Sequence, residues 1–438
     1  MLVAEHPPGW APERSYALRV VCEELLGLPV AARVDPDARG SVALTVAGHG
    51  GRVSVADGLF ALDEALRLDP RSLPADDPPR LDGLPVIYGR PELTLADGEA
   101  RLGVDVFGSA FFCLSRYEEL VTSARDELDR FAAAQSYASR NGLLWRPLVD
   151  EWAALLRRAL EHVWPGLPAP RREFRVVPTH DVDWPRAPEQ GAGRRLAAAA
   201  ASLLRRDARG AAVRLRALAG GRDAFDTFDW IMAASEARSL RSAFYFIVDG
   251  PSPAEACGYG IDEDEIRSLL RACAGRGHEL GLHGSLRSFR DPDRLRQERD
   301  RLLAVCREER IEQASWGGRQ HYLRWDARET WPDWEAAGLD YDSTAGYHDA
   351  TGFRCGTCAE FPVYDHRRRT QLRLRERPLV VMDVALEREE PSLDAAMRRI
   401  EQLKAACRAH AGLFTILWHN SRLVSRRDRR LYLHALDA

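Results

Sequence analysis

From residue 173 onward, apolar segments typical of β-strands alternate with longer amphipathic segments typical of helices. Strands that follow one another across a helix pair in parallel, because the crossover helix returns the chain to the same edge of the sheet. The sequence therefore predicts a mainly parallel sheet, either a barrel or a doubly wound sheet. After a first strand that ends at Asp181, the predicted strands lie at 243–248, 279–282, 339–343, 379–384 and 413–418, and the predicted helices at 261–276, 291–309 and 393–410.

The first part of the chain forms a separate block, in which we find no cluster of acidic and histidine side chains suited to catalysis. Residues 164–170 contain three prolines and are the best candidate for a linker. We therefore expect an accessory α/β domain at 1–165 and a catalytic unit at 173–438. An Ala- and Arg-rich segment at about 193–221 is expected as a helical insertion. Its arginines suit a solvated helix surface, or contact with an anionic substrate or acidic lipid head groups.

Composition is that of an ordinary soluble globular protein, with 45% hydrophobic and 29% charged residues. The net charge of -4 argues against nucleic-acid binding, which leaves a basic footprint. The sequence starts without the features of a signal peptide and has no run of about 18 apolar residues, so no transmembrane segment is expected. Eight scattered cysteines favour a reducing, cytoplasmic compartment, and the sequence does not indicate an oligomeric state.

Polar side chains of the kinds used in metal sites occur at four places where a strand or tight turn ends. In barrels of parallel strands, chemistry is placed at the carboxyl ends of the strands. Two carboxylates two residues apart can divide the work, one holding a cation and the other taking a proton. A site of Asp and His ligands around a cation is the economical interpretation. The side chains are Asp181, Asp183, His283, Arg319, His321 and His419.

Each of these residues also has an ordinary structural interpretation. Asp183 could cap a helix, and His321 could hydrogen-bond the backbone of its own loop. His419 could be a core histidine whose hydrogen bonds are satisfied. His180 could point either way, and the remaining histidines of this region suit structural or surface positions: His278, His348 and His366.

In their order along the chain, these motifs resemble those of the polysaccharide deacetylases with a NodB-type domain (carbohydrate esterase family 4), in a divergent branch with an N-terminal extension. The resemblance covers residues 173 to 425. Its motifs are Asp181-Val182-Asp183, His283, Arg319-Gln320-His321-Tyr322 and Leu417-Trp418-His419. The resemblance implies a distorted (β/α) barrel with fewer than eight regular strands.

The resemblance also implies a reaction, the metal-assisted hydrolysis of an acetamide. Asp181 would be the catalytic base and His419 the general acid, with Asp183 and His283 as metal ligands. Arg319 would orient the base through a charge-assisted hydrogen bond. The family prefers zinc, although Asp and His ligands also accept cobalt, nickel or iron.

One position departs from the family pattern. The second motif usually has another histidine four residues after the first, where this chain has Arg287. Because an arginine stays cationic, it cannot ligate a metal. We expect His321 to be the third ligand, and Tyr322, Trp418 and Arg287 to contact the substrate, the two aromatic side chains as an apolar wall.

The expected substrate is a small molecule or carbohydrate, such as an amino-sugar precursor or a small glycoconjugate. Activity is expected to have a bell-shaped pH dependence, because Asp181 must be ionised and His419, which ordinarily titrates near neutral pH, must be protonated.

Two other functional classes remain open: a related C–N hydrolase acting on a small amide or ureide, and a non-catalytic carbohydrate-binding relative. Metal content would separate the enzymes from the binder, and acetate release would separate the two enzymes.

Overall fold

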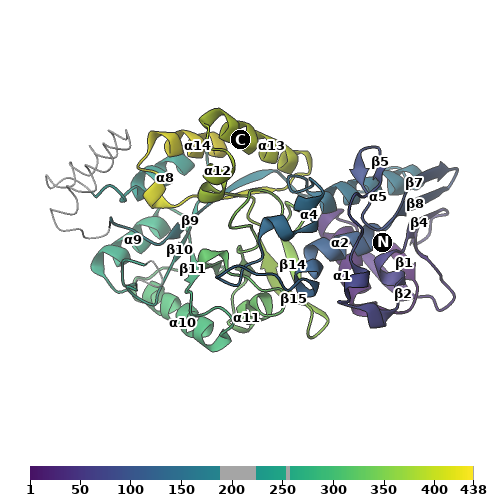
Figure 1. The fold of residues 1–438 in the computed structure, drawn as a ribbon, viewed down its shortest axis with the longest axis horizontal. Coiled ribbons are helices and arrows are strands. Elements are labelled where there is room, and N and C mark those ends of the chain that lie inside the picture. Colours follow the sequence, from purple (N-terminus) through teal and green to yellow (C-terminus); the bar gives the residue numbers. More distant parts are fainter. Residues whose placement is uncertain (188–222, 253–256, 438) are drawn as a thin grey trace.

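The computed structural model describes residues 1–187, 223–252 and 257–437. Two main sheets lie along the long axis of the molecule, the N-terminal one at one end and the larger, curled one at the other (Figure 1). The insertion expected at about 193–221 lies outside the described residues. Within the described ranges, no helix combines the length and apolar character needed to cross a bilayer.

The larger sheet has nine strands among the described residues, in the order β14-β15-β13-β12-β11-β10-β9-β17-β16. The eight strands from β15 to β16 run parallel, and β14 pairs antiparallel with β15. The sheet curls into a part-closed barrel, which is compatible with the distorted (β/α) barrel implied by the sequence (Figure 1). The strands are β9 (Arg175–Val182), β10 (Ala243–Phe246), β11 (Glu279–Gly284), β12 (Gly317–Gln320), β13 (Tyr341–Asp342), β14 (Phe361–Asp365), β15 (Thr370–Glu376), β16 (Val381–Met382) and β17 (Leu413–Leu417).

Helices cover the outside of this sheet (Figure 1). Two of the predicted helices begin at side-chain caps that the sequence carries: Asp291 accepts a hydrogen bond from Arg294 N, and Ser392 accepts one from Ala395 N. Both helices match their predicted ranges to within two residues. The helices are α8 (Phe228–Glu236), α9 (Asp264–Gly275), α10 (Pro292–Glu308), α11 (Thr330–Ala336), α12 (Asp383–Glu389), α13 (Leu393–Ala409) and α14 (Arg426–Leu436).

Two predicted strands are wrong over more than half of their length. The segment 339–343 forms a strand only at Tyr341–Asp342. The segment 379–384 forms a strand only at Val381–Met382, and helix α12 starts at Asp383. The Asp383 carboxylate accepts a hydrogen bond from Val384 N at 2.7 Å, which satisfies a backbone donor of the first helical turn. This change from strand to helix places the Asp383 side chain at the carboxyl end of the sheet.

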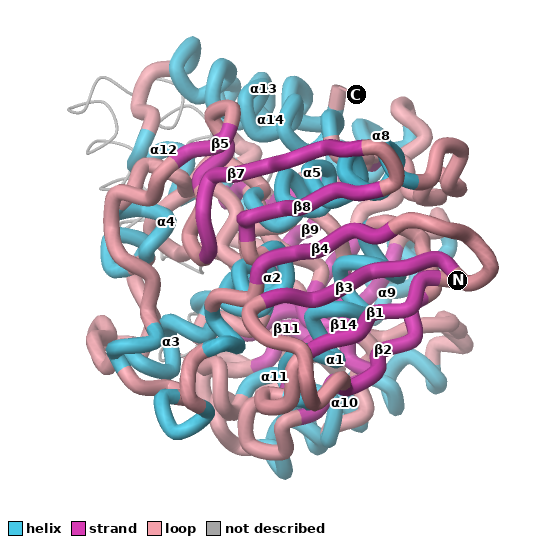
Figure 2. Tube along the Cα trace, turned by 90° about the vertical axis from the view of Figure 1, so that its right-hand side faces the viewer, coloured by secondary structure: helices cyan, strands magenta, loops and turns pink. Residues whose placement is uncertain are grey.

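The N-terminal sheet has six strands among the described residues, in the order β2-β1-β3-β4-β8-β7. Helices α1, α2 and α5 pack on one face, and Figure 2 shows the other face of the sheet toward the viewer. Helix α5 is the longest helix of this block at 16 residues, whereas β6 is only two residues long. The elements are β1 (Leu2–His6), α1 (Ala11–Arg19), the π-helical η1 (Val20–Leu25), β2 (Val30–Val34), β3 (Ser41–Val46), β4 (Arg52–Ala56), β6 (Leu84–Pro85, paired with β5, Arg80–Leu81), β7 (Gly89–Ala96), β8 (Glu99–Val104), α2 (Val106–Leu114), α3 (Tyr117–Val121), α4 (Tyr137–Arg140) and α5 (Leu148–Val163).

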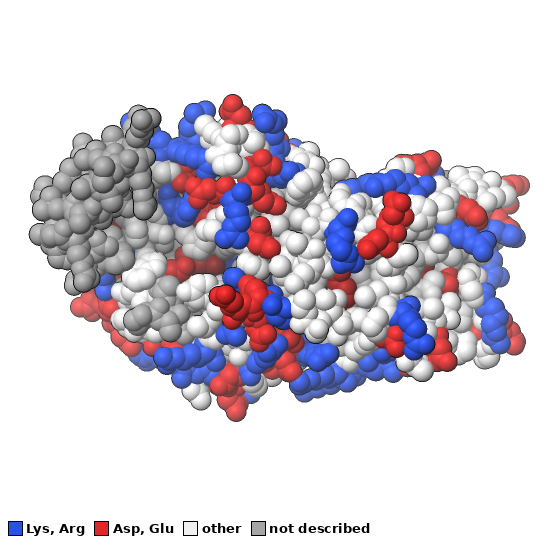
Figure 3. Space-filling view, viewed as in Figure 1, with Lys and Arg blue, Asp and Glu red and all other residues white. Residues whose placement is uncertain are grey.

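Charged side chains of both signs are interspersed on the face of the molecule shown in Figure 3. Across the described structure, many charged side chains form ion pairs, such as Arg157 with Glu161 at 2.6 Å and Arg375 with Glu360 at 2.9 Å. A mixed surface of this kind agrees with the small net charge of the chain.

A buried ionic network links the N-terminal block to the barrel. Glu119, on helix α3 of the N-terminal block, accepts hydrogen bonds from Arg354 at 3.0 and 2.7 Å and from Arg116 at 2.8 Å. All three side chains are at most 3% exposed. The apolar core is also continuous from one sheet to the other. The N-terminal block is therefore packed tightly against the barrel.

Removing Glu119 is expected to destabilise the whole protein. Glu119→Ala leaves Arg354 buried without its carboxylate and Arg116 with Glu118 alone. This change should lower the free energy of unfolding by about 3–5 kcal/mol. Chemical denaturation monitored by fluorescence measures this loss. The control is Glu161→Ala, which removes the half-exposed helical ion pair with Arg157 and should cost about 0.5 kcal/mol. Equal losses in the two variants would contradict the stabilising role of the network.

Candidate metal centre

The acidic and histidine side chains singled out in the sequence converge on one pocket. The pocket has a volume of about 340 Å³ and lies at the carboxyl ends of β9, β11, β12 and β17. Its walls include five of the predicted residues together with Tyr322. Parallel pairing brings these strand ends together, because it places β9 beside both β10 and β17, and β11 beside both β10 and β12. The five residues are Asp181, Asp183, His283, His321 and His419.

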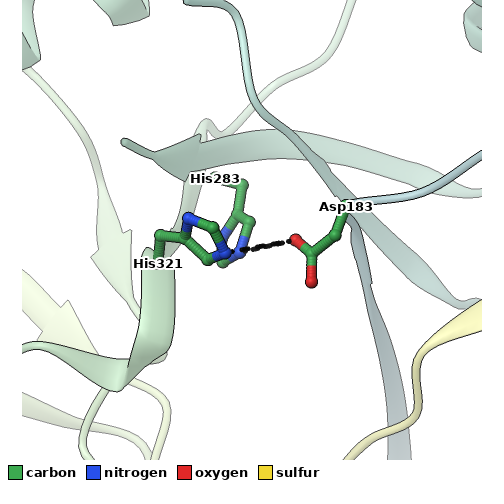
Figure 4. Close-up of side chains that lie close together, drawn as sticks. All are labelled: Asp183, His283 and His321. Carbon is green, nitrogen blue, oxygen red and sulfur yellow. Dashed lines mark ion pairs between the residues drawn. The ribbon is translucent and has the colours of Figure 1, made fainter. Parts of the chain in front are cut away.

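Asp183, His283 and His321 form a compact cluster in this pocket (Figure 4). Asp183 Oδ1 lies 3.3 Å from His283 Nε2 and 3.6 Å from His321 Nε2. One ligand atom from each residue lies within 4.8 Å of the other two. The two histidine side chains are nearly fully buried, and the Asp183 side chain is 18% exposed. These three residues can therefore approach one cation from separate strand ends.

The spacing of the cluster fits a tetrahedral ion. Bonds of about 2.0–2.1 Å to zinc place neighbouring ligand atoms about 3.3 Å apart. The observed separations of 3.3 and 3.6 Å are close to that value and longer than most good hydrogen bonds. One carboxylate and two imidazoles also form a donor set that zinc accepts. The residues therefore fit a divalent cation, without specifying which one.

The backbone fixes the orientation of His283. Its Nδ1 lies 2.9 Å from the carbonyl oxygen of Arg319 on the neighbouring strand β12. Because a carbonyl only accepts, Nδ1 carries the proton and donates this bond, which leaves the lone pair of Nε2 toward Asp183. Metal-binding histidines usually have such a second hydrogen bond. This arrangement follows from the pairing of His283 with Arg319 in the sheet register.

Asp181 lies beside the cluster and is held by Arg319. Arg319 Nη1 donates to Asp181 Oδ1 at 2.8 Å, and both side chains are buried. The other carboxylate oxygen lies 3.7 Å from His283 Nε2. Burial raises the pKa of Asp181, but the charges of Arg319, His283 and His419 outweigh it and hold this pKa below the ordinary value. Asp181 is therefore ionised at neutral pH.

His419 faces the cluster from the opposite strand β17 and is held by Asp383. Its Nδ1 lies 2.9 Å from Asp383 Oδ1, and its backbone N–H donates to Asp383 Oδ2 at 2.8 Å. Nε2 points toward the pocket, 3.7 Å from Asp183 Oδ2. Burial lowers the pKa of His419, but Asp383, Asp183 and Asp181 outweigh it and raise the pKa to about 10. We expected His419 to titrate near neutral pH; its pKa is instead well above that value.

Tyr322 adopts a left-handed backbone conformation beside the cluster, with φ of 59°. Its ring stacks on the imidazole of His321, with ring centroids 4.0 Å apart. Arg130, from the N-terminal block, donates to the carbonyl oxygen of Tyr322 at 3.0 Å. Such backbone strain costs of order 1–3 kcal/mol and tends to occur at functional sites. Tyr322 lines the pocket as the sequence predicted.

Two predicted substrate contacts lie outside the pocket and are corrected. Trp418 is fully buried, and its ring packs against Tyr432 in the core. Because side chains alternate along a strand, Leu417 and His419 face the pocket and Trp418 faces away. Arg287 has a side chain that is 62% exposed and lies 4.0 Å from Asp249. Neither Trp418 nor Arg287 is among the residues that line the pocket.

Other histidines are placed by the structure as follows. His180 is buried, with Nδ1 2.7 Å from Trp418 O and Nε2 3.2 Å from Tyr432 Oη, so it belongs to the core. His278 and His366 are also buried and bond to the backbone. His348, which we expected to be a structural or surface residue, lines the pocket.

The sequence argument missed four polar residues of the site: Arg130, His348 and Arg388 line the pocket, and Asp383 contacts His419 without lining it. Asp383 could have been found, since an acid that ends an apolar segment is the same signal that identified Asp183. Arg130 lies in an irregular segment, where no periodic pattern marks it. The position of His348 depends on the loop that follows β13, which the sequence does not specify.

Comparisons with known proteins give limited information. A family model described as "Family of unknown function (DUF7033)" matches residues 2–165. No match to the sequence was found among curated proteins. Among solved structures, the chain is similar to "Crystal structure of putative polysaccharide deacetylase from Mycobacterium smegmatis", with 18% identity and a TM-score of 0.35 over 63% of this chain and 87% of that chain. At this TM-score, the similarity does not establish a common fold.

Proposed function

We propose that the protein is a metal-dependent hydrolase that removes an acyl group, specifically acetyl, from an N-acylated sugar or small glycoconjugate. The observation that carries this proposal is the convergence of Asp183, His283 and His321 between an ionised Asp181 and a cationic His419. A ligand cluster flanked by one base and one acid matches what amide hydrolysis requires.

Each side chain has a separate task in the proposed reaction. A divalent cation, for which zinc is our first choice, would be held by Asp183, His283 and His321 and would polarise the acyl oxygen and acidify the attacking water. Asp181 takes the proton from that water as its oxygen bonds to the acyl carbon, and Arg319 keeps the carboxylate in place. His419 gives a proton from Nε2 to the nitrogen as the C–N bond breaks.

The surroundings of the site support further parts of the proposal. We infer that residues 1–165 act as an accessory domain that shapes the pocket, because Arg130 forms part of its wall. Eight free, buried cysteines in the described structure support a reducing, cytoplasmic compartment. A related amidase acting on a small amide or ureide would use the same groups, so the substrate screen must include both classes.

The test is a screen of the zinc-loaded protein against N-acetylated amino sugars and small amides. Acetate and free amine should appear in equal amounts from at least one amino sugar. The chelator-treated protein and the Asp181→Asn variant serve as controls and should release neither. Release from simple amides alone would replace the deacetylase assignment with the amidase. A fully metal-loaded protein that releases no amine from any amide would refute the proposed function.

The pH dependence of the reaction should reflect the pKa of His419, which its ion pair with Asp383 raises. His419 must be protonated to act as an acid, and Asp383 keeps its pKa high, so activity should persist above neutral pH. Asp383→Asn removes the charge that raises this pKa and should move the alkaline limb of kcat to lower pH. Rates measured between about pH 6 and about pH 10 check this shift. An unchanged limb would show that another group titrates there.

A further inference from the structure

The pocket wall carries a cation that has no ion-pair partner among the described residues. Arg388, near the end of α12, lines the same pocket as the metal cluster, and its side chain is exposed. The acids around it on α12 are engaged elsewhere. Glu387 pairs with Arg422, Glu389 accepts two hydrogen bonds from Thr351, and Glu390 pairs with Arg399 at 3.0 Å. The charge of Arg388 is therefore available to a ligand.

The other charges of the pocket are balanced in pairs. Arg130 pairs with Asp126 at 2.8 Å and donates to Tyr322 O, so its guanidinium is already occupied. The negative charge of Asp181 is balanced by its ion pair with Arg319. The charge of Asp383 is balanced by its ion pair with His419. A divalent cation would carry more charge than the carboxylate of Asp183 supplies. The loaded pocket then has an excess of positive charge, to which Arg388 adds.

We propose that Arg388 recognises an anionic group, a carboxylate or a phosphate, on the N-acylated substrate. The inference rests on the proposed function for the acyl group and adds the substrate class. An arginine binds both anions through paired, charge-assisted hydrogen bonds, and it does so most strongly in a concave site partly shielded from water. The pocket of about 340 Å³ has room for one small acidic sugar.

The experiment uses three probes that share one acetamide. N-acetylglucosamine is neutral, its 6-phosphate carries a phosphate, and its 3-O-lactyl ether carries a carboxylate. For the full-length, zinc-loaded protein, kcat/KM is measured with each probe, and binding is measured by titration calorimetry in the Asp181→Asn background. The variants are Arg388→Ala, Arg388→Lys and, as a matched control, Arg398→Ala, which alters an exposed arginine of α13 that does not line the pocket.

Arg388→Ala should lower the preference for an anionic probe over the neutral one by about tenfold or more, in both kcat/KM and binding. Arg388→Lys should restore part of this preference, and Arg398→Ala should leave it unchanged. The affected anion identifies the substrate group. If no probe is hydrolysed but Arg388→Ala still weakens anion binding, the subsite holds and the deacetylase assignment fails. If neither anion depends on Arg388 in binding or turnover, the residue is a solvated surface arginine and the proposal is overturned.

Discussion

Replacing Asp181 with asparagine is expected to lower turnover by about two orders of magnitude or more while metal binding is retained. Asparagine has nearly the same shape, and its amide oxygen can still accept the hydrogen bond from Arg319 that Asp181 Oδ1 accepts at 2.8 Å. It cannot take a proton from water at neutral pH. Steady-state rates, measured together with the metal content of the same sample, separate the loss of the base from loss of the cation.

The control for this variant is Asp394→Asn, which neutralises an exposed acid on α13 that does not line the pocket. It changes the net charge by the same amount and should leave turnover unchanged. Near-normal turnover of Asp181→Asn at full metal content would remove the assigned base. The proposed mechanism would then have to be abandoned.

Replacing Asp183 or His283 with alanine is expected to weaken metal binding by about two orders of magnitude or more, and the double variant should retain no metal after dialysis. Each side chain supplies one of the three ligand atoms that lie within 4.8 Å of one another. His321→Ala should weaken binding by a similar factor, because His321 Nε2 completes the set. Zinc titration against a competing chelator measures all three losses.

His348→Ala is the matched control for the ligand variants. His348 lines the same pocket but lies outside the three-residue cluster. Its loss should change zinc affinity far less than the loss of a ligand. If His348→Ala released the metal while His321→Ala retained it, the third ligand would be misassigned.

The sequence predicted the fold best where an apolar strand ends in a polar residue. β11 and β17 lie within a few residues of their predicted ranges, since a short apolar run with such an ending has few other interpretations. The strand prediction for 379–384 was wrong because the segment from Val381 to Leu386 is apolar apart from one acid. Such a segment suits a buried strand and a buried helix equally. In the folded chain α12 begins at Asp383, and its carboxylate accepts a hydrogen bond from Val384 N in the first helical turn.

The candidate site was predicted in part, for a related reason. Asp183, His283 and His321 could be proposed because each stands at a strand end or turn, and parallel strand ends meet at one edge. Trp418 was wrongly placed because the alternation of side chains along β17 was not applied to it. Arg130 could not be found, since it reaches the pocket from an irregular segment of the N-terminal block through long-range packing alone.

The central claim is that one divalent cation is held by Asp183, His283 and His321, and anomalous scattering tests it directly. Crystals grown with zinc would be measured on both sides of the zinc absorption edge. We expect one strong anomalous peak in the pocket, with the Asp183 carboxylate, His283 Nε2 and His321 Nε2 at about 2.0–2.2 Å from it. A zinc-loaded protein whose peak lies elsewhere, or is bound without these three side chains, would contradict the account.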